Sequence, residues 1–217
     1  MIKDNFSIEI KSNIDNNTII FKSGELINIG ASATVGIDDF VRLIFNNIPE
    51  DFKCLYISTK RDITSLINLN NSTSEQKTIL HFKNFSFTDF IIEIIEQIVL
   101  HKNQIIIIEG IDYIFTYDKT ELYYLIKQLT VKYNVCILVE VKISKKTEKR
   151  GGEKKPVISD ILIGSSLIDL SDKIIFSYRY DRFGFIEDEH GDLTLDRLDL
   201  LVVKNNDGNP RTISFKI

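Results

Sequence analysis

The sequence predicts an α/β fold in which a mostly parallel sheet is flanked by helices. Short apolar runs rich in β-branched residues alternate along the chain with helical patterns, an order typical of parallel sheets. One of these runs, from Ile105 to Ile108, consists only of isoleucine, as expected of a strand that is covered on both faces. Near the C-terminus, Asn206-Asp207-Gly208-Asn209 lies between two apolar runs, so we expect the sheet to end in an antiparallel hairpin.

The expected strands are short apolar or alternating runs: residues 18–21, 26–29, 54–58, 78–82, 105–109, 135–141, 173–180, 198–204 and 212–217. The expected helices have apolar residues three and four positions apart and span 37–47, 63–69, 88–101 and 119–133. Thr88 is the expected N-cap of the third helix. In the fourth helix we expect one buried stripe, formed by Leu122, Leu125, Ile126 and Leu129. Polar residues predict loops at 70–76, 142–155 and 181–194.

Length and composition predict one domain, residues 1–217, with 1–22 as an N-terminal lead-in and 142–158 as a basic loop. With 43% hydrophobic residues, a chain of this length can form a full core. The net charge of −4 argues against a protein whose whole surface binds nucleic acid, although it does not exclude a local basic patch. The sequence has neither a signal-peptide pattern nor an apolar run long enough to span a bilayer, so we expect a cytoplasmic protein without membrane contact.

Cysteines and histidines give no metal-site pattern. Cys54 and Cys136 each lie within an apolar run, so we expect free, buried thiols. His81, His101 and His190 are isolated and lack ligand spacing.

A glycine-containing loop follows the strand at 26–29 and precedes the first helix, where a phosphate-binding loop would lie. Such loops end in Gly-Lys-Ser/Thr: backbone N–H groups and the lysine contact phosphate, and the hydroxyl binds Mg²⁺. Here Ile37 and Asp38 occupy the last two positions. A lost charge-assisted hydrogen bond costs roughly 1.5–3 kcal/mol, and a carboxylate near phosphate adds repulsion on the order of 4 kcal/mol. The candidate loop comprises Ala31, Ser32, Ala33, Thr34, Val35, Gly36, Ile37 and Asp38.

Later segments resemble a known family in order and spacing. Glu109 ends the isoleucine strand, where P-loop ATPases place the acidic residue of the magnesium site; a strand-end carboxylate that faces solvent is the alternative. Over nearly its entire length the chain resembles the RecA-like motor domain of DnaB-type replicative hexameric helicases. The matching segments are Ser23 to Ile29, Lys155 to Asp160, Gly164 to Leu167, Asp172, Phe176 to Arg179 and Val202 to Gly208.

The departures from this family lie at the positions that its chemistry uses. The resemblance implies a water-activating glutamate where Lys60 stands and a glutamine that senses the γ-phosphate at Val141. Asn206 occupies the place of the arginine finger, and only Lys204 of that motif remains. We therefore expect no catalytic residues and a vestigial nucleotide site formed by the loop, Glu109 and Lys204. We expect no cofactor, with Mg-ATP as the alternative if Asp38 binds the metal or another lysine replaces the missing one.

One basic stretch stands out on this acidic chain. In the family, mobile loops of this region touch single-stranded DNA, so the resemblance implies a candidate DNA contact. A solvated surface loop is the alternative, because no aromatic residues are interleaved to stack bases. The candidate residues are Lys142, Lys145, Lys146, Lys149, Arg150, Lys154 and Lys155.

Three hypotheses follow. The first is a catalytically defective, DnaB-like RecA-fold protein that acts as a binding or regulatory module in DNA replication or DNA handling, by pairing with a helicase-like or replication protein or with itself. The second is an ATP-dependent motor with a deviant phosphate loop, in which Glu109 and Asp38 share a metal. The third is a single-stranded DNA-binding module. Because few residues precede Leu26, we expect the family's additional N-terminal domain to be missing and ring formation to be weaker.

Overall fold

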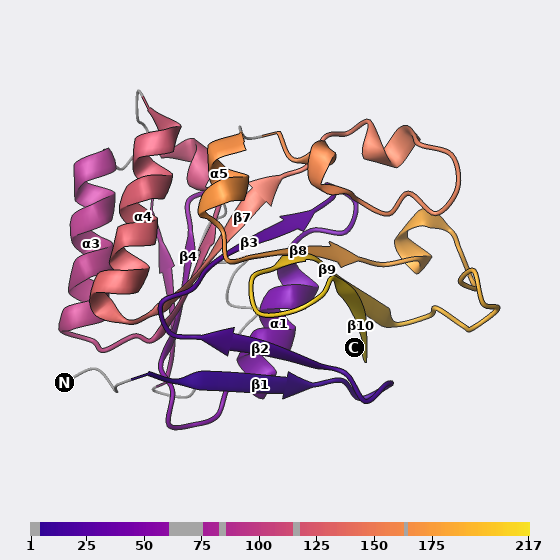
Figure 1. Ribbon diagram of the computed structural model, residues 1–217, viewed down its shortest axis with the longest axis horizontal. Coiled ribbons are helices and arrows are strands. Elements are labelled where there is room, and N and C mark those ends of the chain that lie inside the picture. Colours follow the sequence, from indigo (N-terminus) through magenta and orange to yellow (C-terminus); the bar gives the residue numbers. More distant parts are fainter. Residues whose placement is uncertain (1–4, 61–75, 83–85, 115–117, 163–164) are drawn as a thin grey trace.

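A central sheet of eight strands organises the computed structural model, which describes residues 5–60, 76–82, 86–114, 118–162 and 165–217 (Figure 1). The strand order is β10-β9-β8-β3-β7-β6-β4-β5. The strands from β8 to β5 are parallel, and β9 and β10 continue the sheet in antiparallel pairing, as the sequence predicts. Their bounds are β3 (Leu26–Ala31), β4 (Cys54–Ser58), β5 (Lys77–His81), β6 (Ile105–Glu109), β7 (Cys136–Lys142), β8 (Lys173–Tyr178), β9 (Arg197–Asn205) and β10 (Arg211–Lys216).

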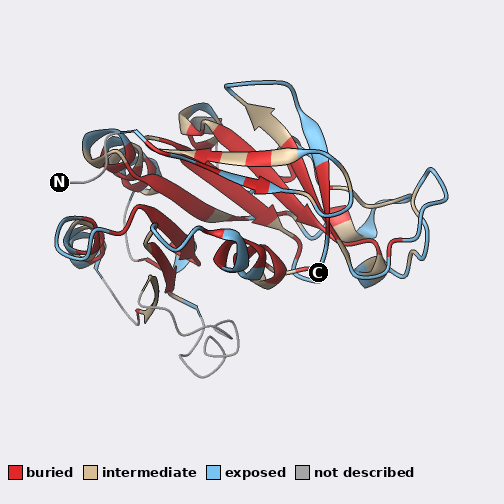
Figure 2. Ribbon diagram, turned by 90° about the horizontal axis from the view of Figure 1, so that it is seen from below, coloured by how far each residue is buried: buried red, intermediate tan, exposed pale blue. Residues whose placement is uncertain are grey.

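Helices cover both faces of the sheet, so its strands are buried (Figure 2). On one face α3 (Phe87–Val99) and α4 (Lys119–Tyr133) pack on an apolar cluster that includes Leu122, Ile126 and Leu129. On the other face lie α1 (Asp38–Asn47) and a separate hairpin of β1 (Ser7–Lys11) and β2 (Thr18–Lys22). Further short elements are α5 (Ser165–Leu170) and the 3₁₀ turns η1 (Ile111–Tyr113), η2 (Thr147–Lys149), η3 (Ile158–Asp160) and η4 (Asp181–Phe183).

The structure differs from the expected elements in three places. The lead-in contains the strand β1, which pairs with β2 because Ile8 and Ile10 alternate with exposed residues and pack against the core. Thr88 is not the N-cap of α3. Ser86 has that role, since its hydroxyl accepts a hydrogen bond from Asp89 N–H, and α3 ends at Val99. Sequence analysis also did not predict α5. The helix expected at 63–69 and most of the expected loop at 70–76 lie outside the described residues.

The two thiols are free and buried, as expected from the sequence. Cys54 and Cys136 lie in the core between the sheet and α1, and burial raises the thiol pKa of both. In the described part of the chain, no helix combines the length and the apolar character needed to cross a bilayer.

Candidate functional site at the carboxyl edge of the sheet

The carboxyl ends of the parallel strands bring the candidate residues to one edge of the sheet. Strand pairing aligns Ser58 with Glu109 and places Ile29 opposite Glu140. Because side chains alternate between the faces of a strand, Glu109 and Glu140 both point to the face covered by α1, whereas Val139 and Val141 pack on the opposite face. Two carboxylates therefore lie on the same face of the neighbouring strands β6 and β7. Glu140 is level with Ile29, shortly before the candidate phosphate loop begins.

Glu109 is a fully buried carboxylate, so the alternative of a solvent-facing side chain is wrong. Its Oε2 atom accepts hydrogen bonds from the hydroxyls of Tyr56 at 2.7 Å and Ser58 at 2.6 Å. Both donors lie on the neighbouring strand β4. A buried carboxylate needs such donors because leaving it without them would cost several kcal/mol, on the order of 3.

Lys60 supplies the positive charge of this site. Its ammonium lies 3.2 Å from Glu109 Oε1 and 2.7 Å from Glu140 Oε1, and therefore bridges the two carboxylates. Gly110 N–H donates to the other oxygen of Glu140 at 2.9 Å. Burial alone would lower the pKa of the Lys60 ammonium, but Glu140 and Glu109 outweigh it, so the pKa lies above the ordinary value of 10.5. One ammonium thus pairs with two carboxylates, and the cluster offsets part of its own negative charge.

The candidate phosphate loop directs much of its hydrogen bonding inward. Val35 N–H and Gly36 N–H both donate to the Ser32 carbonyl, and Gly36 has a φ of +71° that closes the turn. Ile37 lies at the N-cap of α1 and is fully buried in the core, where a phosphate-binding lysine would have to reach outward. The loop thus has the predicted position between β3 and α1, and its last side chains are apolar and acidic.

Gly30 is needed at the start of this loop for packing. A Cβ atom at this position would lie 2.5 Å from a carbon of the Phe176 ring. The ring of a neighbouring strand, rather than a ligand, therefore excludes a side chain at Gly30.

Thr34 binds a carboxylate from a distant part of the chain. Glu148 Oε1 accepts hydrogen bonds from Thr34 N–H at 3.1 Å and from the Thr34 hydroxyl at 2.8 Å. Glu148 belongs to η2, within the predicted basic loop. An amide of the phosphate loop therefore donates to an anion that the protein itself supplies.

The first turn of α1 is acidic. Asp38 is half-buried, and Asp39 is buried next to it. Asp39 Oδ2 accepts a hydrogen bond from Arg179 Nη1 at 2.8 Å, and Arg179 also pairs with Asp181. The hydrogen bonds to Asp181 and Asp39 raise the pKa of the Arg179 guanidinium further above its usual range. This arginine is neutralised by two carboxylates on its own chain.

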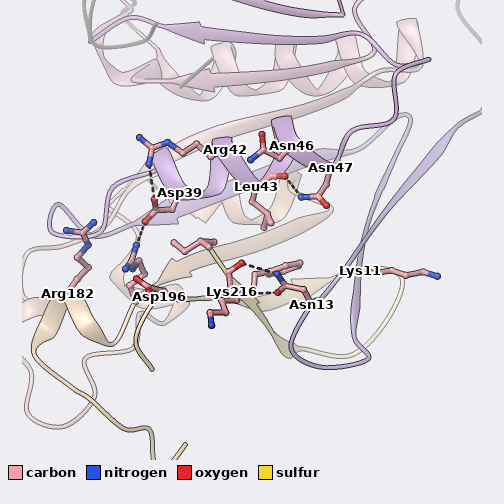
Figure 3. A pocket seen from close by; sticks show the side chains of 13 residues that line it. Lys11, Asn13, Asp39, Arg42, Leu43, Asn46, Asn47, Arg182, Asp196 and Lys216 are labelled. Atoms are coloured by element: carbon pink, nitrogen blue, oxygen red, sulfur yellow. Dashed lines mark hydrogen bonds and ion pairs between the residues drawn. The ribbon is translucent and has the colours of Figure 1, made fainter. Parts of the chain in front are cut away.

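A cationic cavity of about 420 Å³ opens beside this turn (Figure 3). Leu43 and Phe215 are its buried apolar residues, and Asn13 is fixed by two hydrogen bonds to the backbone of Lys216. The lining of the cavity contains more cationic than acidic side chains. The cationic residues are Lys11, Arg42, Arg179, Arg182 and Lys216, and the acidic residues are Asp39 and Asp196. Sequence analysis missed this cavity, because its lining comes from α1, the N-terminal hairpin, η4 and β10.

Lys204 and Asn206 lie at the opposite edge of the sheet. Lys204 lies in β9, which is antiparallel to β8, and Asn206 directly follows it; Asn205 pairs with Lys173 at the start of β8. The Lys204 ammonium donates to the carbonyl of Ile168 at 2.7 Å, while Asn206 N–H donates to the Asp172 carbonyl at 3.0 Å. Neither residue joins the candidate loop within one molecule.

The basic loop is partly anchored. Arg150 pairs with Asp160 at 2.6 Å, Lys155 with Glu153 at 2.7 Å, and Lys142 with Asp112 at 3.5 Å. The Lys154 ammonium lies 5.6 Å from the centroid of the Phe183 ring. Three lysines are exposed and have no ion pair within the described residues: Lys145, Lys146 and Lys149.

An aromatic side chain that sequence analysis missed lies beside this loop. Tyr113 on η1 is 60% exposed, and the Lys142 ammonium lies 4.8 Å from its ring centroid. Tyr113 lies outside the basic stretch in the sequence, so the absence of aromatic residues within that stretch gives no indication of it.

Glu140, which the sequence analysis also passed over, is the β7 residue at the site. Val141 was the expected counterpart of the sensor glutamine, but its side chain lies in the core below α3 and α4. Strand alternation could have predicted the position of Glu140. A carboxylate between two valines points away from the apolar face that the valines share.

Mg-ATP, the ligand that the resemblance implies, does not fit the residues of this edge. The Lys60 ammonium already pairs with both Glu109 and Glu140, and Ile37 lies in the core. Among the described residues, no three His, Cys, Asp or Glu side chains come together in a way that could hold a metal ion.

Comparison with known proteins identifies the fold. No protein-family model matches the chain, and no curated protein does. One solved structure, of an ATPase domain, is similar with a TM-score of 0.72 and 14% identity, over 90% of this chain and 82% of that chain. A DnaB-like replicative helicase, described with its interactions with primase, gives 0.72 and 15%, over 89% of this chain and 55% of that one. The chain therefore has the RecA-like fold of DnaB-like helicase ATPase domains, and it spans about half of the second protein.

Proposed function

We propose that this chain is a RecA-fold protein that does not hydrolyse ATP and acts through binding in DNA replication or DNA handling. Its partner is a helicase-like or replication protein, or a second copy of the chain. The proposal joins two features of the molecule. The fold is that of a helicase motor, and the two carboxylates at its carboxyl edge already hold a lysine of the same chain.

The bridging position of Lys60 is the observation that carries this proposal. A divalent cation that approached Glu109 and Glu140 would have to displace the Lys60 ammonium, which lies 3.2 Å from Glu109 Oε1 and 2.7 Å from Glu140 Oε1. A cation that bound both oxygens of Glu109 would also break the hydrogen bonds of Oε2 to Tyr56 and Ser58. Both steps oppose metal binding.

The loop adds a second barrier to nucleotide binding. A triphosphate beside α1 would meet Asp38 and Asp39, and a carboxylate about 4 Å from a phosphate charge is repelled by roughly 4 kcal/mol at an effective dielectric near 20. Arg179, a buried cation that contacts Asp39 in this turn, is already paired with both Asp39 and Asp181. Ile37 contributes no charge to offset this repulsion.

Binding would use the two opposite edges of the fold. RecA-like domains in ring assemblies form heterologous contacts, in which one edge of a subunit meets a different edge of its neighbour. Lys204 and Asn206 lie at the edge remote from the loop, so a copy of this chain could sit beside an active motor without offering it an arginine finger. Such a subunit would alter the assembly without consuming ATP.

Two assays test the proposal. Equilibrium dialysis of the wild-type chain against millimolar Mg-ATP should detect no binding, and ATPase measurements with single-stranded DNA should match the protein-free control. Light scattering after size exclusion, with the chain alone and mixed with a DnaB-type motor domain, should reveal an assembly. ATP turnover at helicase-like rates, or a chain that remains monomeric in both samples, would contradict the proposal.

A nucleotide-binding motor remains the second candidate, and the cationic cavity beside α1 is the observation that favours it. Arg42 and Arg182 are exposed and line a space of about 420 Å³ next to the loop. If an anionic nucleotide binds there, R42A combined with R182A should weaken Mg-ATP binding at least tenfold. Lys53→Ala, outside the cavity, is the control. Equal affinity in all three proteins would eliminate this site.

A single-stranded DNA-binding module is the third candidate. Lys145, Lys146 and Lys149 are exposed, and Tyr113 offers an aromatic face next to Lys142. Each phosphate contact contributes about −0.7 to the slope of log affinity against log salt, so removing all three lysines should flatten the slope by about 2. A slope that the triple substitution leaves unchanged would exclude this role for the loop.

A further inference from the structure

The cationic turn, residues 144–149, contacts the candidate phosphate loop through one carboxylate. Ser144 N–H also donates to the Asp160 carbonyl, and Thr147 is buried. On either side of the turn the chain is fixed by the bridge between Ile143 and Ile161 and by the ion pair of Arg150 with Asp160. Between these points, Glu148 reaches Thr34 with two hydrogen bonds to the same oxygen. The exposed lysines flank this carboxylate in the sequence.

Thr34 is the residue of the candidate phosphate loop that binds Glu148. The next two amides, of Val35 and Gly36, close the turn onto the Ser32 carbonyl. Thr34 N–H and its hydroxyl are directed to Glu148 instead. Hydrogen bonds to an ionised acceptor are stronger than those between neutral groups.

We propose that Glu148 is a latch that holds the cationic turn on the candidate phosphate loop and thereby limits the freedom of Lys145, Lys146 and Lys149 to follow the backbone of a single-stranded nucleic acid. The inference deepens the proposed function and rests on it, because the latch uses a loop that nucleotide does not occupy. Releasing the carboxylate frees the turn to follow a phosphodiester backbone.

Limited trypsin digestion tests the latch directly, since Lys145, Lys146 and Lys149 are cleavage sites within the turn. In Glu148→Ala, cleavage of the native protein within this turn should be about tenfold faster than in wild type. Thr34→Val keeps the charge, removes only the hydroxyl donor, and should give an increase of about threefold. Glu153→Ala removes an equal charge from the same loop without touching Thr34, so its cleavage within the turn should stay near the wild-type rate.

Binding of an oligothymidine strand at low salt provides the second readout. E148A and E153A change the net charge equally, so a purely electrostatic effect should raise the affinity of both variants for the strand by the same factor. The latch predicts an additional gain in affinity of about threefold for E148A alone. Equal affinities, or equal digestion of all variants, would overturn the inference. ATP turnover by the wild-type chain would refute the proposed function alone, because neither latch assay involves nucleotide.

Discussion

Replacing Lys60 with methionine removes the cation from two carboxylates while keeping the length of the side chain. Glu109 is fully buried and Glu140 is largely so, which leaves little solvent to screen their charges. Removing one partner of a buried ion pair costs about 3–5 kcal/mol. Because the Lys60 side chain is 28% exposed, we expect the lower end of this range, about 3 kcal/mol.

Urea unfolding at neutral pH measures this change. In thermal unfolding, the same loss of about 3 kcal/mol lowers the melting temperature of a chain of this size by roughly 6–12 °C. Lys22→Met is the matched control, because Lys22 pairs with Asp207 at 2.8 Å and both side chains are nearly half exposed. We expect that control to lose less than about 1 kcal/mol.

The comparison of the two variants decides the outcome. Similar losses of unfolding free energy in K60M and K22M would show that Lys60 is an ordinary surface cation. A second substitution, Glu140→Gln, should recover part of the stability lost in K60M, because it removes one of the two unbalanced charges. No recovery in the double variant would refute the bridging role.

Three further predictions follow from the same structure. Ile37→Lys should lower the free energy of unfolding by more than about 2 kcal/mol, because Ile37 is fully buried, and should not create ATPase activity; urea unfolding and a phosphate-release assay check this. Gly30→Ala should cost about 1–3 kcal/mol in urea unfolding, since its Cβ would meet the Phe176 ring at 2.5 Å; a neutral effect would contradict that contact. The raised pKa of Lys60 stabilises the fold below pH 10.5, and this stabilisation is lost as pH rises through the folded pKa, so the stability difference between wild type and K60M should shrink in alkaline urea series.

The sequence was sufficient for the architecture because its strands are covered on both faces. The four isoleucines of β6 and the apolar periodicity of α4 leave few other ways to bury these residues. The turn at Asn206 to Asn209 likewise specified the β9–β10 hairpin. The N-terminal hairpin escaped prediction because β1 has a short alternating pattern that is interrupted by polar residues.

The candidate site was only partly predictable, because its contacts join residues far apart in the chain. The resemblance to the helicase family pointed to Lys60, and the position at a strand end pointed to Glu109. Their ion pair, however, depends on the pairing of β4 with β6. Glu140 could have been found from strand alternation. The contact of Thr34 with Glu148 spans 114 positions, and no local pattern encodes it.

A crystal structure of the protein soaked with a Mg-ATP analogue tests most directly whether internal charges have replaced the nucleotide and its metal. We predict that Lys60 still bridges Glu109 and Glu140, that Glu148 still binds Thr34, and that the loop shows no density for a triphosphate. Density for the analogue and its metal against residues 31–38, with the Lys60 ammonium displaced from both carboxylates, would contradict the account.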